Sequence, residues 1–184
     1  MSPQLLVSVL ASVAQEDEAQ LMKWLLVEWF SHLENVAEVS RKKLMTLLFT
    51  RLLECNQPWI LVKLQDLMNV WTDLVIELTD GNDDKTVEYV FLPLIRVITN
   101  SLHSSLVYWP PAPPSDPDSP EAPEDARRRQ LLYTDPVHSV NLINTIRDHL
   151  KQTIQAVGEA EFQQEWLANV DKDVVNSFGQ LGIL

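Results

Sequence analysis

Four histidines, one cysteine and a serine beside a histidine are the side chains of this sequence whose types suit catalysis or metal binding. Ser139 adjoins His138, but sequence neighbours do not place a hydroxyl and an imidazole in hydrogen-bonding geometry, and no Gly-x-Ser-x-Gly elbow surrounds them. The histidines form no His-Glu-x-x-His pattern, and Cys55 has no second cysteine to support a metal site or a disulfide. A small helical-bundle enzyme would have to use His138 with Asp135 and Asp148. We expect no catalysis and no cofactor.

Carboxylates offer a second kind of chemistry, the attraction of cations. Asp66, Asp73 and Glu77 recur along one stretch of the chain, where a row of acids is either a solvated helix face or a docking surface for a basic peptide. The whole chain has 14 Lys+Arg against 26 Asp+Glu, a net charge of −12 that repels nucleic acid and anionic lipid. We predict a cationic protein segment as the partner, with Asp66, Asp73 and Glu77 as its contacts, and neither nucleic acid nor a membrane.

The residues before position 79 have the apolar spacing of amphipathic helices. Apolar residues at steps of three and four predict helices from about Ser2, Gln20, Ser40 and Pro58. Ser40 is expected to cap the third helix. The expected buried face of that helix is Leu44, Leu47, Leu48 and Leu52. The clearest stripe follows Pro58 and consists of Ile60, Leu64, Leu67, Trp71, Leu74 and Leu78.

The spacing of these four helices bears on the architecture. Two helix pairs recur at a period of about 38 positions, near the roughly 40-residue period of HEAT repeats. Residues 1–78 are therefore interpreted as HEAT-type helix pairs. Each pair in such an array leaves an apolar face that a neighbouring repeat covers. On spacing alone, a small closed helical bundle explains the pattern equally well.

The middle of the sequence changes character twice. Residues 79–109 begin with a Gly-Asn-Asp-Asp turn and continue with β-branched residues around Pro93, so no element is assigned there. Residues 110–134 are rich in proline and acid and too poor in apolar residues to bury a core, which predicts a disordered loop. Their basic run, Arg127 to Arg129, has acidic neighbours and is interpreted as a solvated or salt-bridged stretch.

Residues 135–184 predict a return to helices. Asp135-Pro136 moves the chain out of the loop into an extended or turn conformation, His138 is expected to pack where the chain returns, and Asn141 is expected to cap a helix. Gly158 suits the end of that helix. A further short helix is expected from Ala160 to Asn169, and a last one after a cap at Asp171. The predicted apolar stripe of the first of these helices is Ile143, Ile146, Leu150, Ile154 and Val157.

Two segments of this C-terminal part carry a resemblance to a known family. They are "DARRRQLLYTDPVHSVNL", followed by the capped helix, and "GEAEFQQEWLANVDKDVVNSFGQL"; "SRKKLMTLLFTRLL" adds a looser match further upstream. The sequence resembles the C-terminal end of importin-β superfamily receptors of the importin-eleven branch, in their fungal form. The resemblance implies an all-α HEAT-repeat α-solenoid, ending here in capping helices, that belongs to a receptor shuttling between cytoplasm and nucleus.

The resemblance also implies the partners of such a receptor. They are protein cargo, the FG-nucleoporins of the nuclear pore, and Ran-GTP, which the family binds through N-terminal repeats that this chain does not contain. Segment 87–103 has no counterpart in the family pattern, which leaves a lineage-specific insertion or a retained intron as its explanation. A helical-repeat scaffold or adaptor unrelated to nuclear transport is the alternative function.

Overall fold

The computed structural model describes residues 2–33, 35–80, 127, 131 and 134–183, and every regular element within these ranges is helical. Most of the unassigned stretch 79–109, with all of the possible insertion at 87–103, and most of the predicted loop at 110–134 lie outside the described residues. No helix in the described ranges is both long and apolar enough to span a bilayer. The elements are α1 (Pro3–Ala14), α2 (Glu18–Leu33), α3 (Val39–Leu52), the 3₁₀ turn η1 (Leu53–Cys55), α4 (Pro58–Leu61), α5 (Leu64–Asp80), α8 (Pro136–Ser139), α9 (Leu142–Val157), α10 (Glu159–Glu161), the π turn η2 (Phe162–Trp166), the 3₁₀ turn η3 (Leu167–Asn169) and α11 (Lys172–Gln180).

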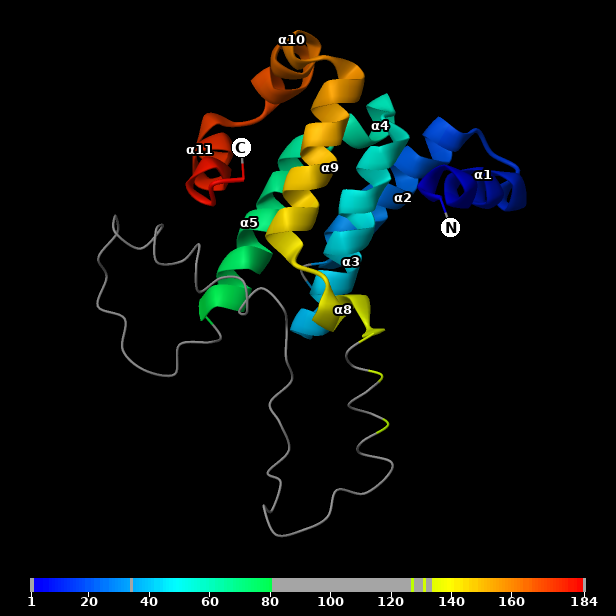
Figure 1. Ribbon diagram of the computed structural model, residues 1–184. Coiled ribbons are helices and arrows are strands. Elements are labelled where there is room, and N and C mark those ends of the chain that lie inside the picture. The colour runs from blue at the N-terminus through cyan, green and yellow to red at the C-terminus, as the bar shows by residue number, and fades with distance from the viewer. Residues whose placement is uncertain (1, 34, 81–126, 128–130, 132–133, 184) are drawn as a thin grey trace.

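The helices succeed one another across the molecule. Figure 1 shows α1 and α2 at one end, α11 at the other, and α3, α5 and α9 between them. Contacts run from α1 to α2, from α3 to α5 and α9, and from α5 to α11, so each helix packs mainly on its neighbours in this row. One apolar core extends through them, from Val7 in α1 to Ile183 beyond α11. The prediction of an all-α, HEAT-like solenoid is confirmed.

The helix predicted from Pro58 onward is present but interrupted. Lys63 N donates to Ile60 O only three residues back (3.0 Å), and this tighter turn separates α4 from α5. The predicted stripe is nevertheless buried throughout, since its residues are at most 5% exposed. The prediction of this buried face is confirmed.

The prediction for α3 is partly wrong. Ser40 does not cap the helix, which begins at Val39; its hydroxyl donates to the Glu38 carboxylate instead. Leu44 and Leu48, expected inside, are 52% and 38% exposed. The residues buried on α3 are Lys43, Thr46, Leu47, Phe49, Thr50 and Leu52.

Polar residues replace two predicted leucines inside α3 because this helix packs against α5, α8 and α9 at once. Thr50 Oγ1 donates to Thr46 O (2.8 Å) and accepts from Trp71 Nε1 on α5 (2.9 Å). A buried polar group is tolerated when it is hydrogen-bonded, and the Thr50 hydroxyl has both a donor and an acceptor beside it. The apolar period alone misses this kind of buried face.

The C-terminal helices follow the prediction except at one place. Asn141 Oδ1 accepts from Asn144 N (3.0 Å) at the start of α9, and Asp171 Oδ1 accepts from Asp173 N (2.8 Å) at the start of α11. Gly158, at φ 101°, ends α9 in a backbone conformation that favours glycine.

The short helix predicted from Ala160 to Asn169 is present, but it is irregular. The chain forms α10, then the π turn η2 and the 3₁₀ turn η3. The side-chain amide of Asn169 donates to Glu165 O, so this carbonyl takes part in a local side-chain bond within the irregular stretch. The wider π turn leaves Phe162 buried and Trp166 only partly exposed.

Candidate functional site

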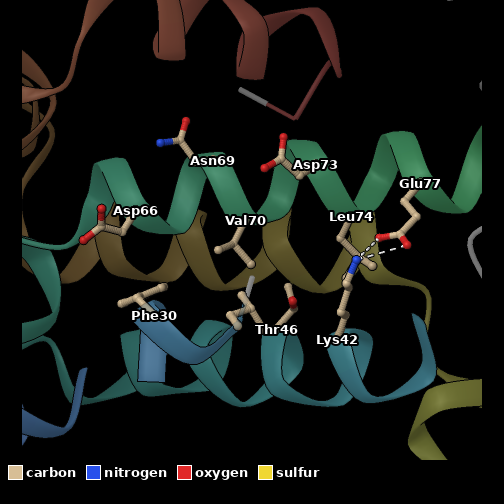
Figure 2. Close-up of a pocket in the computed structure, with 10 residues that line it drawn as sticks. Phe30, Lys42, Thr46, Asp66, Asn69, Val70, Asp73, Leu74 and Glu77 are labelled. Carbon is tan, nitrogen blue, oxygen red and sulfur yellow. Dashed lines mark hydrogen bonds and ion pairs between the residues drawn. The ribbon is translucent and has the colours of Figure 1, made fainter. Parts of the chain in front are cut away.

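A surface cavity of about 210 Å³ lies between α2, α3 and α5, and we call it the acidic pocket. Figure 2 shows α5 along one side and α3 along the other. Val70, Leu74 and Glu77 of α5 are directed toward α3, whereas Asn69 and Asp73 extend from the far edge of α5. The residues that line the pocket are Phe30, Leu33, Lys42, Thr46, Asp66, Asn69, Val70, Asp73, Leu74 and Glu77.

The three carboxylates predicted as contacts for a basic segment all line this pocket. Asp66, Asp73 and Glu77 are seven and four residues apart, which are spacings that bring side chains to one face of a helix. The helix α5 therefore presents them in a row. Aliphatic residues of the same helix, Val70 and Leu74, lie between this row and α3 (Figure 2).

Two of these carboxylates already have a cation beside them. Lys42 Nζ lies 2.8 Å and 3.1 Å from the two Glu77 carboxylate oxygens, and Lys63 Nζ lies 3.0 Å from Asp66 Oδ2. Asp73 is exposed and has no ion pair with any residue that the structure describes. Partly exposed ion pairs of this kind contribute about 1 kcal/mol or less. The residues that line the pocket carry three carboxylates and one ammonium, so their net charge is negative.

The floor of the pocket is apolar with one polar exception. Phe30 is fixed by its contact with Phe49, whose ring centroid is 4.7 Å away. Thr46 is fully buried, and its hydroxyl has no hydrogen-bond partner among the described residues. An apolar floor below a carboxylate wall suits a lysine or arginine side chain, whose aliphatic stem packs while its charged end reaches the acids.

A second cavity, of about 280 Å³, lies where α4 and α5 meet the irregular turns. Trp166 lines it, and the indole Nε1–H of Trp166 is buried without a partner among the described residues. Nearby, Gln65 Oε1 accepts from Asp171 N (3.1 Å) and ties α5 to the start of α11. The residues that line this second cavity are Leu61, Val62, Leu64, Gln65, Glu165, Trp166, Asn169 and Val170.

The predicted helix-start motif, Asp135 to Asn141, lies where the chain re-enters the described core. Asp135 Oδ1 accepts from Val137 N (2.9 Å), Pro136 is the first residue of α8, and His138 is 5% exposed. The carbonyl oxygens of Val137 and Val140 accept from Lys43 Nζ at 2.6 Å and 2.7 Å.

Lys43 is thus an anchor that joins α3 to α8. It is fully buried, and this burial lowers its pKa to about 8, while the nearby Asp135 carboxylate acts in the opposite direction. A buried ammonium of this kind is tolerated only where it is hydrogen-bonded, which the two carbonyls provide.

The residues named for an enzyme line neither of the two cavities described above. His138 is buried at α8, whereas Asp148 is exposed on α9, and neither lines the acidic pocket or the second cavity. Within the described ranges, no group of three or more His, Cys, Asp or Glu side chains is placed to hold a metal ion.

Comparison with known proteins identifies the family to which this solenoid end belongs. A family model described as "Importin-11-like, TPR repeats" matches residues 1–183, nearly the whole chain. The chain belongs to the importin-11-like family. Its sequence is also 28% identical over 156 residues to the importin beta-like protein kap113 of Schizosaccharomyces pombe, which supports the importin-β superfamily and its fungal importin-11 branch.

The alignment with the fission yeast protein covers 84% of this importin-11-like chain but only 14% of the relative. The chain therefore spans a small part of the length of the curated relative that it matches. No solved structure matches the chain.

The pocket residues that α2 and α3 contribute in this importin-11-like chain were not singled out from the sequence as functional residues. Phe30, Lys42 and Thr46 come from α2 and α3, and only the folding of these helices against α5 brings them to the acids. The sequence did contain a signal for Lys42. It belongs to the basic run Arg41 to Lys43, and a basic run in an acidic chain indicates an ion pair with the acidic row. The buried Thr46 carried none, since nothing in its spacing distinguishes it from a surface threonine.

Proposed function

We propose that this chain is the C-terminal part of a nuclear import receptor that contributes HEAT repeats for binding protein cargo and for capping the solenoid. The receptor would shuttle between cytoplasm and nucleus. The observation that carries the proposal is the acidic pocket, where three carboxylates of α5 face an apolar floor in a chain of the importin-11-like family. This role requires binding and no catalysis.

The cargo proposed for the pocket is a protein with a basic segment. Asp73 offers a carboxylate without an ion pair among the described residues, and Asp66 and Glu77 extend the negative wall on either side. A lysine or arginine stem would cover Phe30 and Val70. The contact combines apolar burial with charge attraction, and its association rate would fall as salt screens the charges.

The capping role is supported by a difference between the two ends of the helix row (Figure 1). On α1, the apolar residues Leu5, Val9 and Val13 are 55%, 49% and 79% exposed, a stripe that suits a further repeat. On α11 the exposed positions are polar or glycine, while Phe178 is buried in the core. The exposed residues of α11 are Lys172, Asp173, Asn176, Ser177, Gly179 and Gln180.

The second cavity is the place that we propose for the FG-nucleoporins. The lining includes four aliphatic residues, which would receive a phenylalanine side chain. The Trp166 indole N–H, which has no partner among the described residues, would donate to a peptide carbonyl of the bound repeat. We assign no Ran-GTP contact to this chain, because the family's Ran surface is expected in N-terminal repeats of a longer receptor.

Binding to FG repeats separates the transport function from a scaffold or adaptor. Val62 lines the second cavity and is 59% exposed. Val62→Asp places a charge beside the entering phenylalanine. This variant is expected to bind an immobilised FG-repeat peptide roughly tenfold more weakly than the wild type. The matched control is Ile76→Asp, at a 46% exposed aliphatic residue that does not line the cavity, and it is expected to bind like the wild type. Equal retention of both variants would contradict the assignment of the cavity, and no binding by the wild type would favour the scaffold.

A further inference from the structure

The acidic pocket contains a cation of the chain's own. The run Arg41-Lys42-Lys43 sends its three charged ends to three different places. Arg41 Nε pairs with Glu38 in the first turn of α3 (2.7 Å), and Lys43 is buried against α8. Lys42 reaches across to α5, where the two oxygens of the Glu77 carboxylate lie 2.8 Å and 3.1 Å from its ammonium (Figure 2).

We propose that Lys42 is an intramolecular competitor for the acidic pocket. In the free chain its ammonium occupies the position at Glu77 that a lysine or arginine side chain of the bound partner takes in the complex. The inference rests on the proposed function, namely that the pocket receives a basic segment. It adds that binding begins with an exchange of one cation for another, so the affinity of the pocket is set partly by its own lysine.

The exchange is energetically easy in this geometry. The side chains of Lys42 and Glu77 are 26% and 36% exposed, so the pair is partly solvated and an ammonium that leaves it returns to water at little cost. Lysine has a long flexible stem and no fixed fork of donors, which lets it swing aside without a change in the helix. An incoming cation gains Glu77 and also lies near Asp73, to which Lys42 has no bond among the described residues.

Thr46 provides an independent sign that the pocket has a further occupant. Its side chain is fully buried on the pocket floor, and its hydroxyl finds no partner among the residues that the structure describes. Buried hydroxyls are usually hydrogen-bonded, so this one has the capacity for a further polar partner. Lys42 at Glu77 leaves it unpaired, so a second polar group of the bound segment, and not the ammonium at Glu77, would pair with Thr46.

A binding titration with matched charge variants tests the inference. The probe is a fluorescein-labelled nona-lysine peptide, and its anisotropy is measured with the full chain at low ionic strength. Lys42→Met and Arg41→Met remove one positive charge from adjacent positions, but only Lys42 lines the pocket. Lys42→Met is expected to bind the peptide about two- to fivefold more tightly than Arg41→Met, the range expected for release of a partly exposed ion pair. Lys42→Gln, a second neutral variant, is expected to behave like Lys42→Met.

The outcomes distinguish this inference from the function on which it rests. If Asp73→Asn weakens peptide binding while Lys42→Met and Arg41→Met bind equally, the pocket binds cations but Lys42 is no competitor, and the inference is overturned alone. If neither the wild type nor Lys42→Met binds the peptide, the proposed function of the pocket fails and the inference fails with it. Tighter binding by both Lys42 variants than by Arg41→Met supports both.

Discussion

Replacing Phe178 with alanine is expected to lower the free energy of unfolding by about 4 kcal/mol, the usual size for a phenylalanine removed from a core. Phe178 is fully buried and its ring lies 5.5 Å from that of Trp71, so it is the main apolar link between α11 and α5. The change is measured by urea unfolding followed by tryptophan fluorescence. Amide hydrogen exchange is expected to show α11 opening first, since few other buried side chains anchor it.

Two further variants separate the loss of packing at Phe178 from a change in the helix propensity of α11. Phe178→Leu keeps an apolar side chain in the same place and is expected to cost less than half as much as Phe178→Ala. Asn176→Ala, at an exposed position of the same helix, is expected to change stability by less than about 0.5 kcal/mol. A loss as large for Asn176→Ala as for Phe178→Ala would show that α11 is not held by this aromatic contact.

Replacing Lys43 with alanine is expected to cost about 3 kcal/mol near neutral pH. Two losses add together: the packing of a fully buried stem, and the hydrogen bonds to the carbonyls of Val137 and Val140. They are partly offset because the variant no longer buries a charge. The α8 segment loses its anchor to α3, and exchange of the amide hydrogens of α8 and of the start of α9 is expected to accelerate. Unchanged exchange there would contradict the anchoring role.

The pH dependence of this contribution has a definite sign. The pKa of Lys43 is lowered to about 8 in the folded chain from its ordinary value of 10.5, so between these values the unfolded chain binds more protons and folding becomes more favourable as pH rises. Lys43→Met keeps most of the stem and has no group that titrates at this position. The stability of the wild type relative to Lys43→Met should therefore increase by as much as about 3 kcal/mol as the pH rises over this range. Lys23→Met, at an exposed lysine of α2, is the control. A difference that does not change with pH would contradict the cost assigned to the buried charge.

The sequence predicted those parts of the fold that depend on one helix at a time. The buried stripe of α5, the caps at Asn141 and Asp171, and the proline that begins α4 all follow from local spacing and local hydrogen bonds. Leu44 and Leu48 were assigned to the wrong face, since the side of α3 that becomes buried is decided by three other elements. Buried Lys43 could not be foreseen, because its partners stand more than 90 positions away.

In the candidate site, too, only the features of a single helix could be predicted from the sequence. The carboxylates at positions 66, 73 and 77 are one stripe of one helix, so their common wall follows from the sequence. The pocket itself requires the approach of α2 and α3, which supply its floor and Lys42. Competition by Lys42 can therefore be inferred only from the folded chain, although the acid row that it neutralises is visible beforehand.

The most direct measurement of the pocket's role is the affinity of a nona-lysine peptide for two triple variants of equal charge. One replaces the pocket acids (Asp66→Asn, Asp73→Asn, Glu77→Gln), and the other replaces three exposed acids of α9 and α10 (Asp148→Asn, Glu159→Gln, Glu161→Gln). The pocket triple is expected to weaken binding by at least roughly tenfold, and the control triple by no more than the small effect of net charge. Equal weakening by the two triples would show that only the overall charge of the chain attracts the peptide, and would contradict a binding site between α3 and α5.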